Sequence, residues 1–220
     1  NFETTEEWIL SPGDILYVPP KLAHFGVAED DCITLSVGFR APKNIEMISS
    51  FADFAGDTIA PNKQQFFEDP ERKQQRQSAE ITADDRSQLR EMLTSLANDD
   101  VFDQWLGCFL SEPKNPETLV AEKDSYTVDE INQLLSSCSD VYRNEGSRFL
   151  FIETEKACVL FADGERYPLA PQHANFVQYL CEKIEYDART LQDYCNILEI
   201  QSIVISLIEH GSLHCDTDDS

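Results

Sequence analysis

Hydrophobic and polar positions alternate along the first forty residues of the chain, as they do in β-strands. Residues 15–18 are branched and apolar, and residues 32–39 return with a strict period of two. One side of this second run collects small or polar side chains: Cys32, Thr34, Ser36 and Gly38. A small, polar face opposite an apolar face is typical of a barrel strand that leaves room for a ligand. Residues 1–42 are therefore predicted to be strands from the trailing part of a β-barrel.

The period changes to that of helices after Ala41-Pro42. Residues 44–59 place apolar side chains at helical spacing, and Thr82 is predicted to cap a second helix. A third helix, which begins near Asp100, is rich in aromatic residues. Adjacent amphipathic helices of this kind must be covered by another apolar surface. Either the barrel wall or a second copy of the chain would provide that cover.

The last hundred residues combine helices with short strands. Thr127 and Glu130 have the spacing of a capping box, which opens a helix. Strands are predicted around 141–143, 148–153 and 158–161, and Asp163-Gly164 is a strong turn signal. Three helices follow, at 172–181, at 191–195 and in a last segment that Gly211 closes, and a frayed tail ends the chain. The pattern as a whole predicts an α+β fold.

The chain is strongly acidic, with a formal net charge of −24 over 220 residues. Such a surface repels nucleic-acid phosphates and attracts basic partners, although solubility in a salt-tolerant cytoplasm explains it equally well. Residues 191–210 contain no Lys or Arg, so direct nucleic-acid binding is not expected, and we assign this helix to packing or protein contacts. No apolar run approaches the roughly 18 residues of a membrane span, and a cytoplasmic location is expected.

The cysteines and the common catalytic motifs give little support to other chemistry. Seven cysteines are scattered singly without a C-x-x-C pair, which indicates reduced, mostly buried thiols rather than a zinc site. The sequence contains no G-x-S-x-G elbow, no phosphate-binding loop and no G-x-G-x-x-G motif. No H-x-D or H-x-E precedes His24, and the single H-x-D match in the chain is His214-Cys-Asp216, near the C-terminus.

The stretch Ser11-Pro-Gly-Asp-Ile-Leu-Tyr-Val-Pro-Pro-Lys-Leu-Ala-His-Phe-Gly26 contains the best candidate for a metal ligand. A turn at Gly13-Asp14 leads into a strand, which Pro19-Pro20 ends because proline has no N–H for a neighbouring strand. The bend then presents His24 at the start of the next extended run. An imidazole held in this way suits Fe, Zn or Cu. The alternative is a histidine that merely lines a turn.

This stretch, followed by Ile33-Thr-Leu-Ser-Val-Gly-Phe-Arg-Ala-Pro42, resembles the JmjC-type bacterial ribosomal oxygenases. These are cupin-like enzymes that use Fe(II) and 2-oxoglutarate to hydroxylate an arginine of a large-subunit ribosomal protein. The resemblance implies the end of a double-stranded β-helix barrel in residues 1–42 and a helical dimerisation segment in residues 43–122. It implies a winged-helix-like domain in residues 123–220. A homodimer with a basic ribosomal protein as substrate is expected.

The same resemblance implies roles for a few residues. His24 takes the position of the distal metal-binding histidine, while Ser36 and Tyr17 line the pockets for cosubstrate and substrate; ordinary barrel packing is the alternative for both. Arg40 is interpreted as a structural ion-pair or cap residue. The family's H-x-D ligand pair and its 2-oxoglutarate clamp precede this motif. The chain is therefore expected to be the C-terminal part of a longer enzyme and to be inactive alone.

Two other functions stay open at this point. The chain could be a non-catalytic cupin-like and winged-helix module for protein interactions, which keeps the barrel shape without iron. A winged-helix nucleic-acid binder is the third possibility, and the acidic charge disfavours it. The metal hypothesis further requires that the imidazole of His24 face the hollow of the barrel rather than the solvent.

Overall fold

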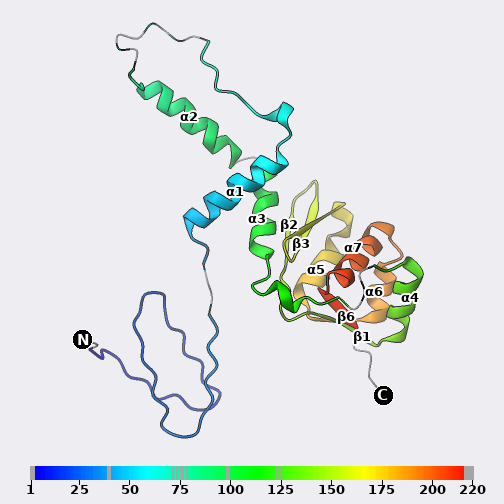
Figure 1. Ribbon diagram of the computed structural model, residues 1–220. Coiled ribbons are helices and arrows are strands. Elements are labelled where there is room, and N and C mark those ends of the chain that lie inside the picture. Colours follow the sequence, from blue (N-terminus) through cyan, green and yellow to red (C-terminus); the bar gives the residue numbers. More distant parts are fainter. Residues whose placement is uncertain are drawn as a thin grey trace. The chain divides into compact units, whose positions relative to one another are not determined.

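The computed structural model describes residues 3–38, 41–70, 72, 74, 77, 79–97, 100–121, 123 and 125–215. The chain divides into two units, Asn1–Ala41 and Pro42–Ser220 (Figure 1). Among the described helices, none combines the length and the apolar character that a bilayer span requires. Arg40 and the tail from residue 216, for which the sequence suggests a structural role and fraying, lie outside the described residues.

The first unit has extended backbone but no assigned strand between residues 3 and 38. Two turns are closed by hydrogen bonds, from Asp14 N to the Ser11 carbonyl (3.0 Å) and from Leu22 N to the Pro19 carbonyl (3.3 Å). Every described side chain in this range is exposed except that of Val18, which is half-buried. The predicted strand pairing is thus not seen here, because an alternating pattern stabilises a strand only when a neighbour accepts its hydrogen bonds and covers its apolar face.

The second unit begins with three helices, α1 (Asn44–Thr58), α2 (Ala83–Leu96) and α3 (Asp100–Ser111), which occupy the predicted positions. Short 3-10 turns lie at Pro61–Lys63 and Pro116–Thr118. Helix α1 packs against α3 through an aromatic cluster. Its centre is the indole of Trp105, which is 2% exposed and donates a 3.0 Å hydrogen bond to the Ser50 hydroxyl. The rings around it are those of Phe51, Phe102 and Phe109.

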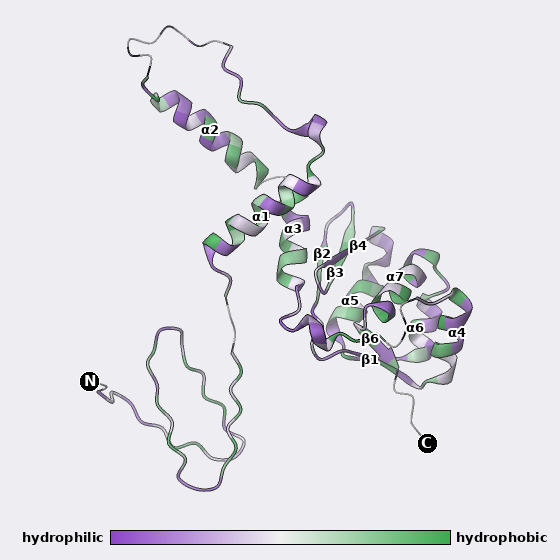
Figure 2. Ribbon diagram, in the orientation of Figure 1, coloured by the Kyte–Doolittle hydropathy of each residue, from purple (hydrophilic) through white to green (hydrophobic). Residues whose placement is uncertain are grey.

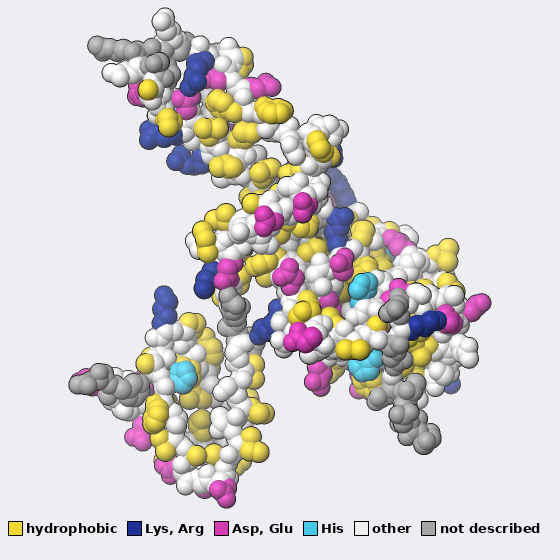
Figure 3. All heavy atoms as spheres, in the orientation of Figure 1, with side chains coloured by type: hydrophobic (Ala, Val, Ile, Leu, Met, Phe, Trp, Pro, Cys, Tyr) yellow, Lys and Arg dark blue, Asp and Glu magenta, His cyan; other side chains and the backbone are white. Residues whose placement is uncertain are grey.

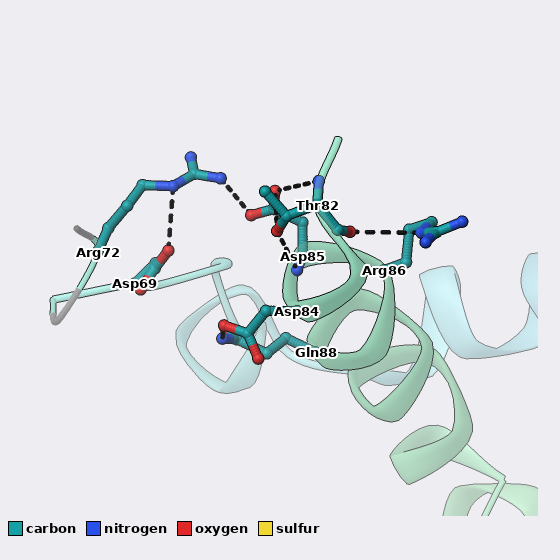
Figure 4. A network of polar contacts seen from close by, with 7 residues as sticks. All are labelled: Asp69, Arg72, Thr82, Asp84, Asp85, Arg86 and Gln88. Atoms are coloured by element: carbon teal, nitrogen blue, oxygen red, sulfur yellow. Dashed lines mark hydrogen bonds and ion pairs between the residues drawn. The ribbon is translucent and has the colours of Figure 1, made fainter. Parts of the chain in front are cut away.

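Thr82 caps the N-terminus of α2, as the sequence predicts, and the structure shows that the cap is a full capping box (Figure 4). The Thr82 hydroxyl accepts from Asp85 N (3.1 Å), and the Asp85 carboxylate accepts from Thr82 N (2.9 Å). Arg72 pairs with Asp85 and, at 3.2 Å, with Asp69. The hydrogen bonds from Thr82, helped by the Arg72 charge and opposed by burial, lower the pKa of Asp85. The segment before α2 is therefore tied to the start of this helix.

The remaining chain forms an α+β domain, which confirms the predicted fold class. Its elements are α4 (Val128–Ser137), β1 (Asp140–Arg143), β2 (Phe149–Glu153), β3 (Cys158–Ala162), β4 (Glu165–Leu169), a 3-10 turn (Pro171–His173), α5 (Ala174–Glu182), β5 (Glu185–Asp187), α6 (Ala188–Tyr194), α7 (Leu198–Glu209) and β6 (Leu213–Cys215). The strands form two antiparallel sheets with the orders β5-β1-β6 and β2-β3-β4.

The β2-β3-β4 sheet contacts helices on both sides. Helix α3 contacts all three strands, and α5 contacts β2 and β3 (Figure 1). The period of two along β3 explains this arrangement, since Leu160 belongs to the domain core whereas Phe161 meets α3. Helix α3 approaches so closely at Gly107 that a Cβ there would overlap the ring of Phe161. Glycine at this position permits the close contact between helix and sheet.

The core of the domain lies between α4, α5, α6 and α7 and the strands they cover. Figure 2 shows the hydrophobic residues that run through these elements. Helix α7 contributes five buried hydrophobic side chains: Ile200, Ile203, Val204, Leu207 and Ile208. It ends in a turn at Gly211, whose φ of 71° is the left-handed conformation expected of a glycine C-cap. Helix α7 is therefore a core helix, which agrees with the packing role inferred from its lack of Lys and Arg.

Candidate functional site

The bend around His24 is built by prolines and a left-handed residue. Pro19 accepts the turn hydrogen bond from Leu22 N, and Lys21 adopts a φ of 68° between them. A non-glycine residue in this conformation is uncommon and marks a specific turn. The bend places the His24 ring so that its Nδ1 lies 3.3 Å from the Leu22 carbonyl oxygen.

This contact bears directly on metal binding. When Nδ1 carries the proton, it donates to the Leu22 carbonyl, and Nε2 keeps its lone pair. A metal-bound histidine commonly donates its other ring N–H to a backbone carbonyl, which fixes the tautomer and the orientation of the ring. In that tautomer the contact leaves Nε2 of His24 able to accept a metal, and the metal role itself stays a prediction. An open hollow lined by Leu22, Ala23, His24 and Phe25 lies beside the ring.

The described residues do not complete a metal site. A mononuclear iron centre of the oxygenase type requires two histidines and a carboxylate. Within the part of the chain that the structure describes, no three His, Cys, Asp or Glu side chains come close enough to hold a metal ion. Among the described residues, the His24 imidazole therefore stands without the other two donors that such a centre requires.

Tyr17 and Ser36, the two predicted pocket residues, are both exposed, and neither lines the hollow beside His24. The imidazole of His24 is exposed too. Nearly all of its described neighbours are equally exposed. Exposure alone therefore does not distinguish a ring that would face a barrel interior from one that faces solvent. The predicted assignments of these three residues stay predictions.

A second surface of interest lies on the helices of residues 43–122. Helix α1 packs Phe51 against α3, yet Ile45 and Ile48 on the same helix are 67% and 62% exposed. Leu93 on α2 is 71% exposed, and Figure 3 shows hydrophobic side chains gathered along both helices. Exposed apolar side chains at helical spacing favour contact with another apolar surface.

The structure also brings together residues that the sequence pattern did not connect. The sulfur atoms of Cys138 and Cys215 lie 2.8 Å apart, although 77 positions separate the two residues. Asn115, Thr118, Asn144, Glu145, Gly146 and His214 line an open hollow. Both arrangements depend on β6, a strand of three residues that periodicity cannot identify.

Two family models match the chain. The JmjC domain matches residues 1–47, and the ROXA-like winged helix matches residues 87–214, more than half of the chain. The "Ribosomal protein uL16 3-hydroxylase" of Escherichia coli K12 is 29% identical over 211 residues, which cover 96% of this chain and 54% of that protein.

Solved structures give the same result. The structure of YcfD, a ribosomal oxygenase from Escherichia coli, in complex with cobalt and succinic acid matches with a TM-score of 0.70 and 26% identity. A structure of YcfD with cobalt and 2-oxoglutarate matches with a TM-score of 0.69 and 25% identity. Each match covers 82% of this chain and 48% of YcfD.

These matches confirm the predicted resemblance to JmjC-type ribosomal oxygenases. The chain spans about half the length of the relatives it matches.

Proposed function

The chain belongs to the ROXA-like winged-helix family, and from this premise we propose that it is part of an Fe(II)- and 2-oxoglutarate-dependent oxygenase. The proposed reaction is hydroxylation of an arginine in a large-subunit ribosomal protein, for which uL16 is the model because the Escherichia coli relative is named for it. The observation that carries the proposal is His24. Its ring is set by a Pro-Pro bend and by the Leu22 carbonyl, within the segment that matches the JmjC domain.

His24 has one role in this scheme, as the distal histidine ligand. The Leu22 carbonyl holds the proton on Nδ1 and leaves Nε2 to the metal. Bound Fe(II) with 2-oxoglutarate supplies the activation of O₂ that hydroxylation of a C–H bond requires. The H-x-D ligand pair and the cationic clamp for 2-oxoglutarate would come from outside these 220 residues. The chain alone is accordingly proposed to be inactive.

The exposed strand-like runs fit a barrel wall. Small or polar side chains occupy every second position of residues 32–38. If this run paired with further strands, Ser36 would face a ligand and the apolar side chains between would face a core. Ser36 would then donate a hydrogen bond near the cosubstrate, and Tyr17 would line the substrate pocket. We assign residues 1–42 to the barrel, 43–122 to dimerisation and 123–220 to a winged-helix-like domain.

Charge and exposed surface support the proposed partners. The net charge of −24 favours binding of a basic ribosomal protein, as the substrate, over binding of nucleic acid. The exposed side chains Ile45, Ile48 and Leu93 support a homodimer through the helical segment. We place the protein in the cytoplasm, where ribosomal proteins are made and assembled.

The test is His24→Ala in the full-length protein, assayed for succinate formation with Fe(II), 2-oxoglutarate and a peptide of the ribosomal protein. Removal of a ligand should reduce turnover to background, because two remaining donors do not hold the metal in a reactive geometry. His214→Ala is the matched control, since His214 is exposed and lies on β6. Turnover retained in His24→Ala would remove His24 from the metal site.

A second candidate function is a non-catalytic interaction module. The observation in its favour is that the described residues bring no second or third ligand to His24. In that case the full-length protein would form no succinate with any ribosomal peptide, and His24→Ala would bind the same partners as the wild type. Iron-dependent turnover in the wild type would exclude it.

A further inference from the structure

The cysteines of the chain have different surroundings, and one pair stands apart. Burial raises the pKa of the thiols of Cys181 to about 12 and of Cys195 to about 11. Burial also raises the pKa of the thiols of Cys108 and Cys158. A raised thiol pKa reduces the fraction of thiolate, which is the reactive form. These four thiols are therefore poor nucleophiles at neutral pH.

Cys138 and Cys215 are brought together by the fold. Cys138 ends α4, and its N–H bonds to the Leu134 carbonyl at 3.3 Å. Cys215 is the last residue of β6 and pairs with Val141 of β1. Val141 follows Cys138 by only three positions. The sheet β5-β1-β6 and the end of α4 thus hold the two sulfur atoms 2.8 Å apart. The two sulfur atoms are thus only about 0.8 Å farther apart than in a disulfide bond, whose S–S length is roughly 2.05 Å.

We propose that Cys138 and Cys215 are a redox-sensitive dithiol that closes to a disulfide between the first helix and the last strand of the C-terminal domain. The bond would join the end of α4 to β6 and enclose the segment that contains most of the domain core. A zinc site is a poor alternative, because zinc requires four ligands and the described residues provide no group of three around this pair. The inference is independent of the iron site.

The oxidant required is a small-molecule disulfide such as oxidised glutathione. Cys138 is half-buried and Cys215 is buried, so the Cys138 thiol loses its proton and attacks one sulfur of the small disulfide. One thiol of the oxidant leaves, and a mixed disulfide remains on Cys138. The Cys215 thiolate then attacks the Cys138 sulfur and releases the second thiol. Two electrons pass to the oxidant, and the protein loses two hydrogen atoms.

The experiment is oxidation of the reduced full chain with oxidised glutathione, followed by peptide mapping under non-reducing conditions. Trypsin leaves Cys195 and Cys215 on one peptide, so cleavage after Glu199 and Glu209 is added to separate them. The expected product is a peptide containing Cys138 linked to one containing Cys215, which dithiothreitol separates. Cys32→Ser, which removes an exposed thiol elsewhere, should keep the product.

Thermal unfolding provides the second measurement. A disulfide that closes a loop of 77 positions should raise the unfolding temperature of the domain by roughly 5–15 °C over the reduced form. Cys138→Ser and Cys215→Ser should each abolish this difference. Two results would overturn the proposal. One is oxidised wild type that yields no linked Cys138–Cys215 peptide. The other is an oxidant-dependent rise in unfolding temperature that is as large in both serine variants as in the wild type.

Discussion

Residues 3–38 and residues 126–215 contain similar apolar side chains, yet they reach opposite states. Leu35 lies in an alternating run and is 86% exposed, whereas Leu160 lies in β3 and is 0% exposed. Both residues have the pattern of a strand. The difference is that β3 has β2 and β4 as neighbours and helices on both faces, while the described backbone around Leu35 forms no strand pairing. A hydrophobic pattern determines which face of a strand or helix is apolar. That face becomes buried only when a second surface covers it.

The largest expected effect comes from the same substitution in these two regions. Leu160→Ala should lower the free energy of unfolding by about 2–5 kcal/mol, because it leaves a cavity in a packed core. Leu35→Ala should change it by less than about 0.5 kcal/mol, because an exposed side chain loses little on truncation. Chemical denaturation of the two variants, followed by tryptophan fluorescence or circular dichroism, measures both values. Equal losses would show that residues 32–38 are packed.

A smaller effect is expected from glycine replacements. In Gly107→Ala the new methyl group would overlap the ring of Phe161, which is 1% exposed and has little room to move. The strain should cost about 1–3 kcal/mol, partly offset by about 1 kcal/mol from the better helix propensity of alanine.

Gly26→Ala is the matched control in the first unit, since among the described residues only its own chain neighbours lie within 4 Å of the added Cβ. Its free energy of unfolding should stay within about 0.5 kcal/mol of the wild type. A Gly107→Ala variant that is as stable as the control would mean that α3 and the sheet are not in close contact.

Local signals made much of the second unit predictable. Thr82 and Thr127 are the N-caps that the sequence predicts, and Gly211 takes the positive φ of a C-cap. Each of these features is decided by hydrogen bonds within a few residues of the chain. Strands β5 and β6, of three residues each, were missed because so short a run has no measurable period.

The candidate site was predictable only in part. His24 could be singled out because the Pro-Pro bend and the histidine lie in one short stretch. The proximity of Cys138 and Cys215 could not, because it depends on the pairing of β6 with β1 across 77 positions. Tyr17 and Ser36 depend on strand neighbours that the described residues do not provide. Contacts between distant segments are set by topology, which local patterns do not determine.

Hydrogen exchange of backbone amides on the 220-residue chain tests the contrast between the two regions most directly. The amides of residues 200–208 in α7 should exchange only through global unfolding, because their helix is buried in the core. The amides of residues 15–18 and 32–38 should exchange at the rates of an unfolded peptide. Protection of both runs to the same degree as α7 would contradict the conclusion that these barrel-like segments have no strand partner among the residues that the structure describes.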